Sequence, residues 1–192
     1  MRKSRHLNNF APQPSQHGYA LFIVLMIMIV IALLVVTAVQ SYNTEQRIST
    51  NEADRKLALS LAEAALRKGE NKILEFDGKK IVFAANCKGK IGTTDTNGLC
   101  ASPDAKSSGD IKVEATSGNA WEREESNKLY IDENSVRVTD IKVDNVSKEP
   151  RYIIEYISTD SAQGSTIYRV TAKAWGKNNN TVVMLQSYVS DE

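Results

Sequence analysis

The sequence predicts an α+β protein in which one long N-terminal helix is followed by a β-rich C-terminal domain. From Tyr19 to about Phe76 there is no proline and, before Gly69, no glycine, so helix breakers are absent for roughly fifty residues. The last third of the chain instead holds three segments rich in β-branched and aromatic residues, separated by short polar turns. With 192 residues, the chain is long enough for one membrane helix and one modest domain.

Residues 1–18 are predicted to be a leader outside the fold. The segment is polar, contains two prolines and three Lys/Arg side chains, and shows neither helical nor strand periodicity. An ordinary secretory signal is cut after its apolar region, at small residues. Here the small residue, Gly18, comes before the apolar region, so we expect cleavage between Gly18 and Tyr19, which leaves the apolar stretch at the start of the mature chain.

The first part of the helix, residues 19–42, is predicted to span a membrane. Between Tyr19 and Val39 there is no charge, and Thr37 is the only clearly polar side chain. The run meets the roughly 20-residue length that an α-helix needs to cross a bilayer core. Because the basic residues precede the run, the N-terminus is expected in the cytoplasm, with a single pass through the inner membrane and the rest in the periplasm or outside.

The second part of the helix is expected to pack on the C-terminal domain, residues 77–192. Along it, one set of apolar or small residues recurs at spacings of three and four, which marks one face of a helix. The members of this set are Leu59, Ala62, Leu66, Gly69 and Ile73.

The clearest strands are predicted at residues 151–158, 166–176 and 181–189, which form an antiparallel meander. On the middle strand, alternate residues divide into two faces. One face is apolar and is the expected seat of the helix, while the other is more polar. The apolar face consists of Tyr168, Val170, Ala172 and Ala174; the polar face consists of Ile167, Arg169, Thr171 and Lys173. Weaker strand signals occur at residues 80–84, 111–115, 128–130 and 135–143, and the topology of residues 77–150 is not predicted.

Cys87 and Cys100 both fall in the exported part of the chain, where disulfides persist. Closing the loop between them would stabilise the domain by about 3 kcal/mol on the chain-entropy model. No nearby histidine completes a four-ligand metal set. We predict a disulfide between the two, with free thiols and a metal site as the alternatives.

Nothing in the sequence predicts nucleic-acid binding, a cofactor or catalysis. The net charge is +1 and no Lys/Arg cluster is dense enough for a phosphate footprint. GxSxG, HExxH and glycine-rich phosphate loops are lacking, and both histidines lie in the leader, which removes the commonest general base. Residues 95–98 match the opening of a calcium loop but lack its third acidic position and closing glutamate, so we predict a turn and no metal site there.

The basic leader, Gly18, the aromatic Tyr19, the uncharged helix and the β-rich domain together resemble a type IV prepilin. The stretches NEADRKLALSLAEAALR and YRVTAKAWGKNNNTVVMLQSYV resemble the PilX/PilK group of minor pilins. The resemblance implies a type IV pilin-like fold, cleavage by a prepilin peptidase after Gly18 and N-methylation of Tyr19. It also implies a later place in a pilus at the cell surface, where the apolar helix packs among those of other minor pilins and the major pilin.

The fifth position of the mature chain departs from the usual pilin pattern, because most pilins have glutamate there and this chain has Ile23. Cleavage creates a positive amine on Tyr19, and an unpaired charge in an apolar bundle is costly. In the family, the glutamate of each incoming subunit neutralises the amine of the subunit above it. A chain with Ile23 cannot do this, so the resemblance implies a minor pilin at the pilus tip. There it would prime assembly with other minor pilins, and the position would allow a tip adhesin as a further partner.

Two alternatives remain open. A K-type pseudopilin of a type II secretion system shares these features but usually carries a larger inserted domain, for which residues 77–192 leave little space. A membrane-tethered adhesin or binding module that never polymerises would keep its leader.

Overall fold

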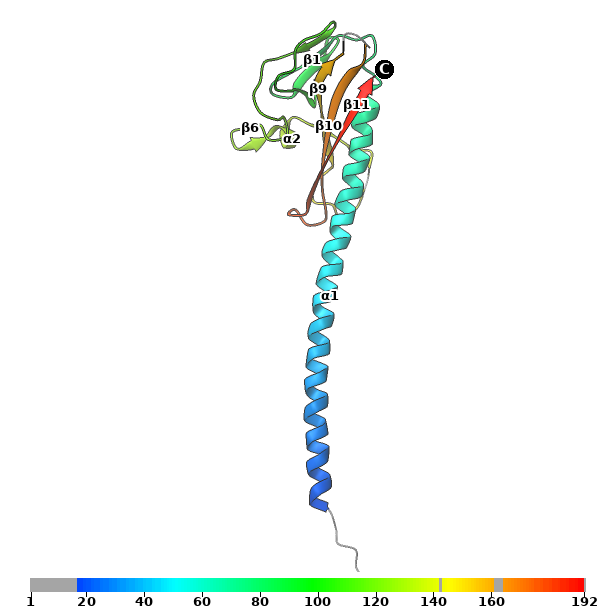
Figure 1. Ribbon diagram of the computed structural model, residues 1–192, viewed down its shortest axis with the longest axis vertical. Helices are drawn as coiled ribbons and strands as arrows, with labels where there is room; N and C mark the ends of the chain where they lie inside the picture. Colours follow the sequence, from blue (N-terminus) through cyan, green and yellow to red (C-terminus); the bar gives the residue numbers. More distant parts are fainter. Residues whose placement is uncertain (1–16, 142, 161–163, 192) are drawn as a thin grey trace, which may run out of the picture. The chain divides into compact units, whose positions relative to one another are not determined.

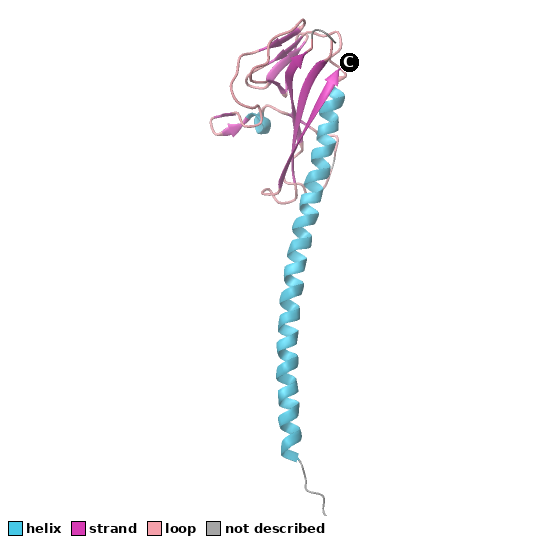
Figure 2. Cartoon of the chain, viewed as in Figure 1, coloured by secondary structure: helices cyan, strands magenta, loops and turns pink. Residues whose placement is uncertain are grey.

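The computed structural model describes residues 17–141, 143–160 and 164–191. The chain divides into an N-terminal unit, Met1–Ser49, and a C-terminal unit, Thr50–Glu192. Helix α1, His17–Ile73, begins in the first unit and ends in the second (Figures 1 and 2). The predicted leader lies outside the described residues, apart from His17 and Gly18 at the start of α1.

The N-terminal unit presents apolar side chains on all sides of its helix. The large apolar residues between Tyr19 and Val39 expose between 41 and 70% of their surface. Thr37 donates its hydroxyl to the Leu34 carbonyl at 2.9 Å, so the polar side chain of this stretch is satisfied within the helix. By length and composition, α1 is able to cross a membrane.

The described residues of the C-terminal unit form eleven strands, which pair into sheets. A four-stranded sheet has the order β3-β2-β1-β5, with β1 at Ile81–Phe83, β2 at Lys88–Ile91, β3 at Thr94–Asn97 and β5 at Ile111–Val113. The larger sheet has the order β11-β10-β9-β4, with β8 also paired to β9. Its strands are β11 (Val182–Asp191), β10 (Thr166–Trp175), β9 (Arg151–Thr159), β4 (Leu99–Ala101) and β8 (Val136–Arg137). A hairpin of β6 (Glu124–Glu125) and β7 (Lys128–Leu129) leads into the short helix α2 (Tyr130–Glu133).

The predicted meander is confirmed. β10 pairs antiparallel with β9 on one side and with β11 on the other, in a register that runs from Thr166 opposite Asp191 to Trp175 opposite Val182. The three strands lie side by side in Figure 1.

Elsewhere the strands differ from prediction. Residues 95–97, predicted as a turn, belong to strand β3, because they pair with β2 across the tight turn that contains Gly92. Among the described residues of 135–143, only the short β8 is a strand, since the chain after it packs as a loop against α1. Two parallel pairs, β1 with β5 and β4 with β9, were not predicted and make both sheets mixed.

The helix packs on the apolar face of β10, as predicted, through small side chains. Its buried stripe consists of Ala58, Leu61, Ala62, Ala65, Gly69 and Ile73. A Cβ atom at Gly69 would lie 2.4 Å from Cγ1 of Val170, so glycine lets the helix approach the sheet closely. Leu59, predicted in this stripe, is instead 38% exposed, because the stripe passes through Ala58 and Leu61. The helix also ends at Ile73 rather than Phe76, since Asp77–Gly78 form a turn with a positive φ at Gly78.

Candidate functional site

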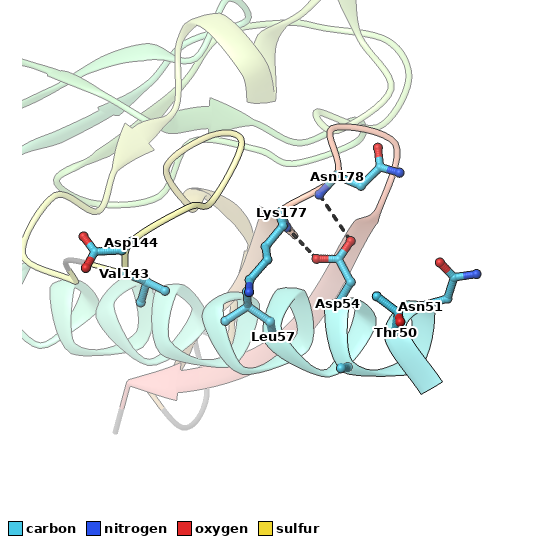
Figure 3. Close-up of a pocket in the computed structure, with 9 residues that line it drawn as sticks. Thr50, Asn51, Asp54, Leu57, Val143, Asp144, Lys177 and Asn178 are labelled. Carbon is cyan, nitrogen blue, oxygen red and sulfur yellow. Dashed lines mark hydrogen bonds between the residues drawn. The ribbon is translucent and has the colours of Figure 1, made fainter. Parts of the chain in front are cut away.

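Asp54 of α1 binds the turn between β10 and β11 (Figure 3). Its Oδ1 accepts a hydrogen bond from the Lys177 amide at 2.5 Å, and its Oδ2 accepts one from the Asn178 amide at 3.3 Å. The pKa of the Asp54 carboxyl is lowered: a hydrogen bond from the Thr181 side chain is the largest cause, burial opposes it, and the two amides add to the lowering. We call this arrangement the Asp54 clamp.

The local sequence shapes the turn for this contact. A Cβ atom at residue 176 would lie 2.3 Å from Oδ1 of Asp54, so the close approach requires Gly176. The Gly176 amide donates to the Thr181 carbonyl at 2.9 Å, and the Asn178 side chain accepts from the Asn180 amide at 3.0 Å. The turn therefore holds two consecutive amides toward the carboxylate.

A cavity of about 570 Å³ lies beside the clamp, entirely within the C-terminal unit. The ionisable groups in its lining are Asp54, Asp144 and Lys177. Both oxygens of Asp54 already accept hydrogen bonds from the turn. Its role is therefore structural: it joins α1 to the turn between β10 and β11. In the part of the chain that the structure describes, no cluster of three or more His, Cys, Asp or Glu side chains could hold a metal ion.

The opposite face of the larger sheet, predicted as the more polar one, buries a charged pair. Arg169 donates to Glu155 through Nε at 3.0 Å and through Nη2 at 2.9 Å, and Glu155 is fully buried. Burial alone would lower the pKa of Arg169, but the hydrogen bonds and charge of Glu155 outweigh it and raise that pKa. Trp121 covers the pair, with the Arg169 guanidinium 4.3 Å from its ring centroid.

A second charged pair lies on the same face. Lys173 donates to both carboxylate oxygens of Asp132, at 2.7 and 2.9 Å, and lies 5.0 Å from the ring centroid of Trp175. Trp175 is 3% exposed and therefore belongs to the core. The two pairs thus fasten residues 119–133 over the sheet.

Cys87 and Cys100 form the predicted disulfide, with both side chains fully buried and their Cα atoms 4.0 Å apart. The Gly98 amide donates to the Cys87 carbonyl at 2.8 Å. Since Cys100 belongs to β4, the bond ties the chain after β1 to the larger sheet.

The N-terminal residues that the sequence singled out lie in the other unit. Gly18 and Tyr19 fall in the first turn of α1, where Tyr19 is 70% exposed. Ile23 follows one turn later on the same side of the helix and is 41% exposed.

Asp54 and the Glu155–Arg169 pair were not predicted as functional or structural sites. The sequence around an acidic residue inside a helix does not indicate which distant residue will bind it. The same is true of a charged residue at one of the alternate positions of a strand. The two stretches quoted above for their family resemblance do contain the parts of the clamp: Asp54 in the first, and Gly176, Lys177 and Asn178 in the second.

A helix with an apolar first part, whose later part packs on mixed β-sheets, defines a type IV pilin-like protein. Comparison with protein-family models agrees: "Type IV pilus assembly protein PilX C-term" matches residues 90–191 and "PilX N-terminal" matches residues 17–67. The chain therefore belongs to the PilX family and is a type IV pilus minor pilin of the PilX group. No curated protein and no solved structure matches it.

Membership has three further consequences. The family is structural, its members act with other components of the pilus, and α1 fits a membrane-anchored subunit. Each part of the Asp54 clamp also falls within one of the matched ranges.

Proposed function

We propose that this chain is a tip subunit of a type IV pilus and primes assembly together with other minor pilins. The observation that carries the proposal is the apolar Ile23 at the fifth position after Gly18, in a helix without charge from Tyr19 to Val39. Family membership supports the pilus, and the missing carboxylate supports the tip.

The proposed sequence of events begins in the inner membrane. A prepilin peptidase cuts between Gly18 and Tyr19, and the new amine of Tyr19 is N-methylated. The apolar part of α1 then leaves the lipid for a bundle of other subunits' helices, because both surroundings accept apolar side chains.

Charge pairing then decides the position of the subunit. A glutamate of the subunit below neutralises the positive amine of Tyr19. Ile23 has no carboxylate with which to neutralise the amine of a subunit above. A subunit of this kind is accommodated at the top of the filament, where nothing above needs neutralising.

The test of position is Ile23→Glu, with Ile27→Glu as the matched control, since residue 27 is one turn further along the same side of α1. We expect Ile23→Glu to lower the number of pili and to spread the labelled subunit along the filament. Ile27→Glu should not redistribute the subunit, because its carboxylate is one turn away from the position that pairs with the amine. Unchanged piliation and tip labelling in Ile23→Glu would show that the missing carboxylate does not place the subunit.

The test of processing is the intact mass of the chain purified from membranes. An N-methylated start at Tyr19 is expected. A retained leader would instead favour a membrane-tethered binding module that does not polymerise.

A further inference from the structure

Strand β11 forms an open edge of the larger sheet. It pairs with β10 on one side, and no described strand pairs with its other side. It is ten residues long, so it presents a long row of backbone groups to the surroundings.

The residues whose backbone groups point outward follow from the register. The Gly176 amide donates to the Thr181 carbonyl, and hydrogen-bonded pairs alternate along an antiparallel ladder. The β10–β11 register has no bulge, so Val183, Leu185 and alternate residues beyond them bond to β10. The free amides and carbonyls are therefore those of the intervening residues, which are Val182, Met184, Gln186, Tyr188 and Ser190.

Apolar surface lies on both sides of this edge. On the face away from the helix, Val182, Met184 and Tyr188 expose 44, 39 and 64% of their surface. Between β11 and α1 lies a groove of about 400 Å³, which Met184 also borders from the edge. Its lining consists of Glu52, Arg55, Lys56, Leu59, Val183, Met184 and Leu185.

The two edges of the four-stranded sheet, β3 and β5, are protected, and β11 is not. Strand β3 has four residues and carries Asp95 paired with Lys90, and β5 has three residues with Lys112 at its centre. From Val182 to Ser190, by contrast, there is no charge, proline or glycine. Natural proteins blunt exposed edges with short strands, charges or proline, so an edge without these features is a site for strand pairing.

We propose that β11 binds an extended segment of another pilus protein, which adds a strand to the sheet. This inference rests on the proposed function as a pilus subunit. The segment is uncharged where it crosses β11, with apolar side chains at alternate positions over Leu59 and Val183. It carries an acidic residue at the end beside Arg55 and Lys56, since these two cations outnumber Glu52 in the groove and form no ion pair among the described residues.

A second copy of this chain fits the edge less well. Two β11 strands that pair antiparallel about a twofold axis would point the two Thr50–Ile73 helix segments in opposite directions, because this segment runs along the sheet with β11. Each chain would then enter its C-terminal unit from the opposite end, which does not suit two subunits anchored in one membrane.

The experiment places a photo-crosslinking amino acid at Tyr188 in the full-length chain, in piliated cells. The matched control carries the probe at Leu74, which is 70% exposed in the turn after α1. We expect the Tyr188 probe, and not the Leu74 probe, to form an adduct that maps by mass spectrometry to one extended segment of another pilus protein.

A second change tests strand pairing itself. Met184→Lys places a charge on the edge, and we expect it to lower the Tyr188 adduct by roughly tenfold, because the added strand would bury the lysine without a partner. Leu74→Lys should leave the adduct unchanged, and the fluorescence of Trp121 and Trp175 should show that both variants fold.

Three results would overturn the inference: an adduct with a second copy of the chain, a Tyr188 adduct no stronger than that at Leu74, or an adduct insensitive to Met184→Lys. The mass of the same purified chain separates these from failure of the proposed function. A mature start at Tyr19 with any of the three results overturns the strand site alone, whereas a retained leader overturns the proposed function and the strand site with it.

Discussion

Asp54 shows how a single side chain joins segments that are far apart in the chain. In the middle of a helix its carboxylate finds no free amide of its own helix to bind. Its hydrogen-bond donors lie 123 and 124 residues later, in a turn where Gly176 has no Cβ atom to clash with the carboxylate. The N-terminal edge of the C-terminal unit is thereby tied to the hairpin of its last two strands.

The clamp predicts a pH-dependent contribution to stability. The pKa of Asp54 is lower in the folded chain than its ordinary value of 3.8. The contribution is therefore present above the unfolded pKa and is lost as the pH falls below it through the folded value. We expect Asp54→Asn to lower the melting temperature by a few degrees at pH 7 and by less at pH 3, as measured by thermal unfolding of the detergent-solubilised chain.

The matched control is Asp77→Asn, because Asp77 is exposed and makes no side-chain hydrogen bond among the described residues. Its melting temperature should follow the wild type at each pH. An Asp54→Asn difference that stays constant from pH 7 to pH 3 would mean that the charge of the carboxylate does not contribute.

At the scale of the element, β10 is buried on both faces, and the two faces use different chemistry. Val170, Ala172 and Ala174 are fully buried beneath α1, whereas Arg169 and Lys173 are buried on the other face with acidic partners. A charge can be buried there because each cation has a carboxylate at hydrogen-bond distance. The charged face therefore stabilises the sheet only while its pairs are complete.

Removing one partner tests this dependence. Glu155→Gln leaves the Arg169 guanidinium buried without its counter-charge, and we expect a loss of about 3 kcal/mol in the free energy of unfolding. Urea unfolding of the detergent-solubilised chain measures it, with the fluorescence of Trp121 as a local probe, since its ring lies against Arg169.

The double variant Glu155→Met with Arg169→Met supplies the control. Replacing both charges by apolar side chains of similar length should recover much of the lost stability, because no unpaired charge remains. If Glu155→Gln unfolds at the same urea concentration as the wild type, solvent reaches the Glu155–Arg169 pair and the pair is not buried.

At the scale of the whole molecule, the elements with strong periodicity were predictable from the sequence. The absence of helix breakers predicted α1, and β-branched alternation predicted β9, β10 and β11. The helix-bearing face of β10 was also predictable, because Val170, Ala172 and Ala174 are apolar at alternate positions.

The rest depends on contacts between distant residues. β4 is three residues long, and its pairing with β9 is decided by the tertiary fold. The interpretation of Leu59 as part of the buried stripe was wrong because a stripe of alanines gives a weak apolar signal. Likewise, nothing local in the sequence connects Asp54 to Lys177, or Glu155 to Arg169. The predicted disulfide needed only the two cysteines and the export of the domain.

The division into two units predicts that the C-terminal unit folds without the N-terminal one. Every residue of its buried core lies after Thr50, and the exposed apolar stretch from Tyr19 to Val39 lies before it. We therefore expect residues 50–192, exported to the periplasm so that Cys87 and Cys100 oxidise, to be monomeric without detergent. The tryptophan emission and melting temperature should match those of the full chain in detergent within a few degrees.

A shorter chain that begins at Ala62 is the matched control. It loses Asp54 together with Ala58 and Leu61 from the buried stripe, so it should unfold at a clearly lower temperature than residues 50–192. Aggregation of residues 50–192 with no cooperative melting would show that the stretch before Thr50 is needed for the core to form. Equal melting of the two truncated chains would show instead that the clamp and the first turns of the packed helix add nothing to it.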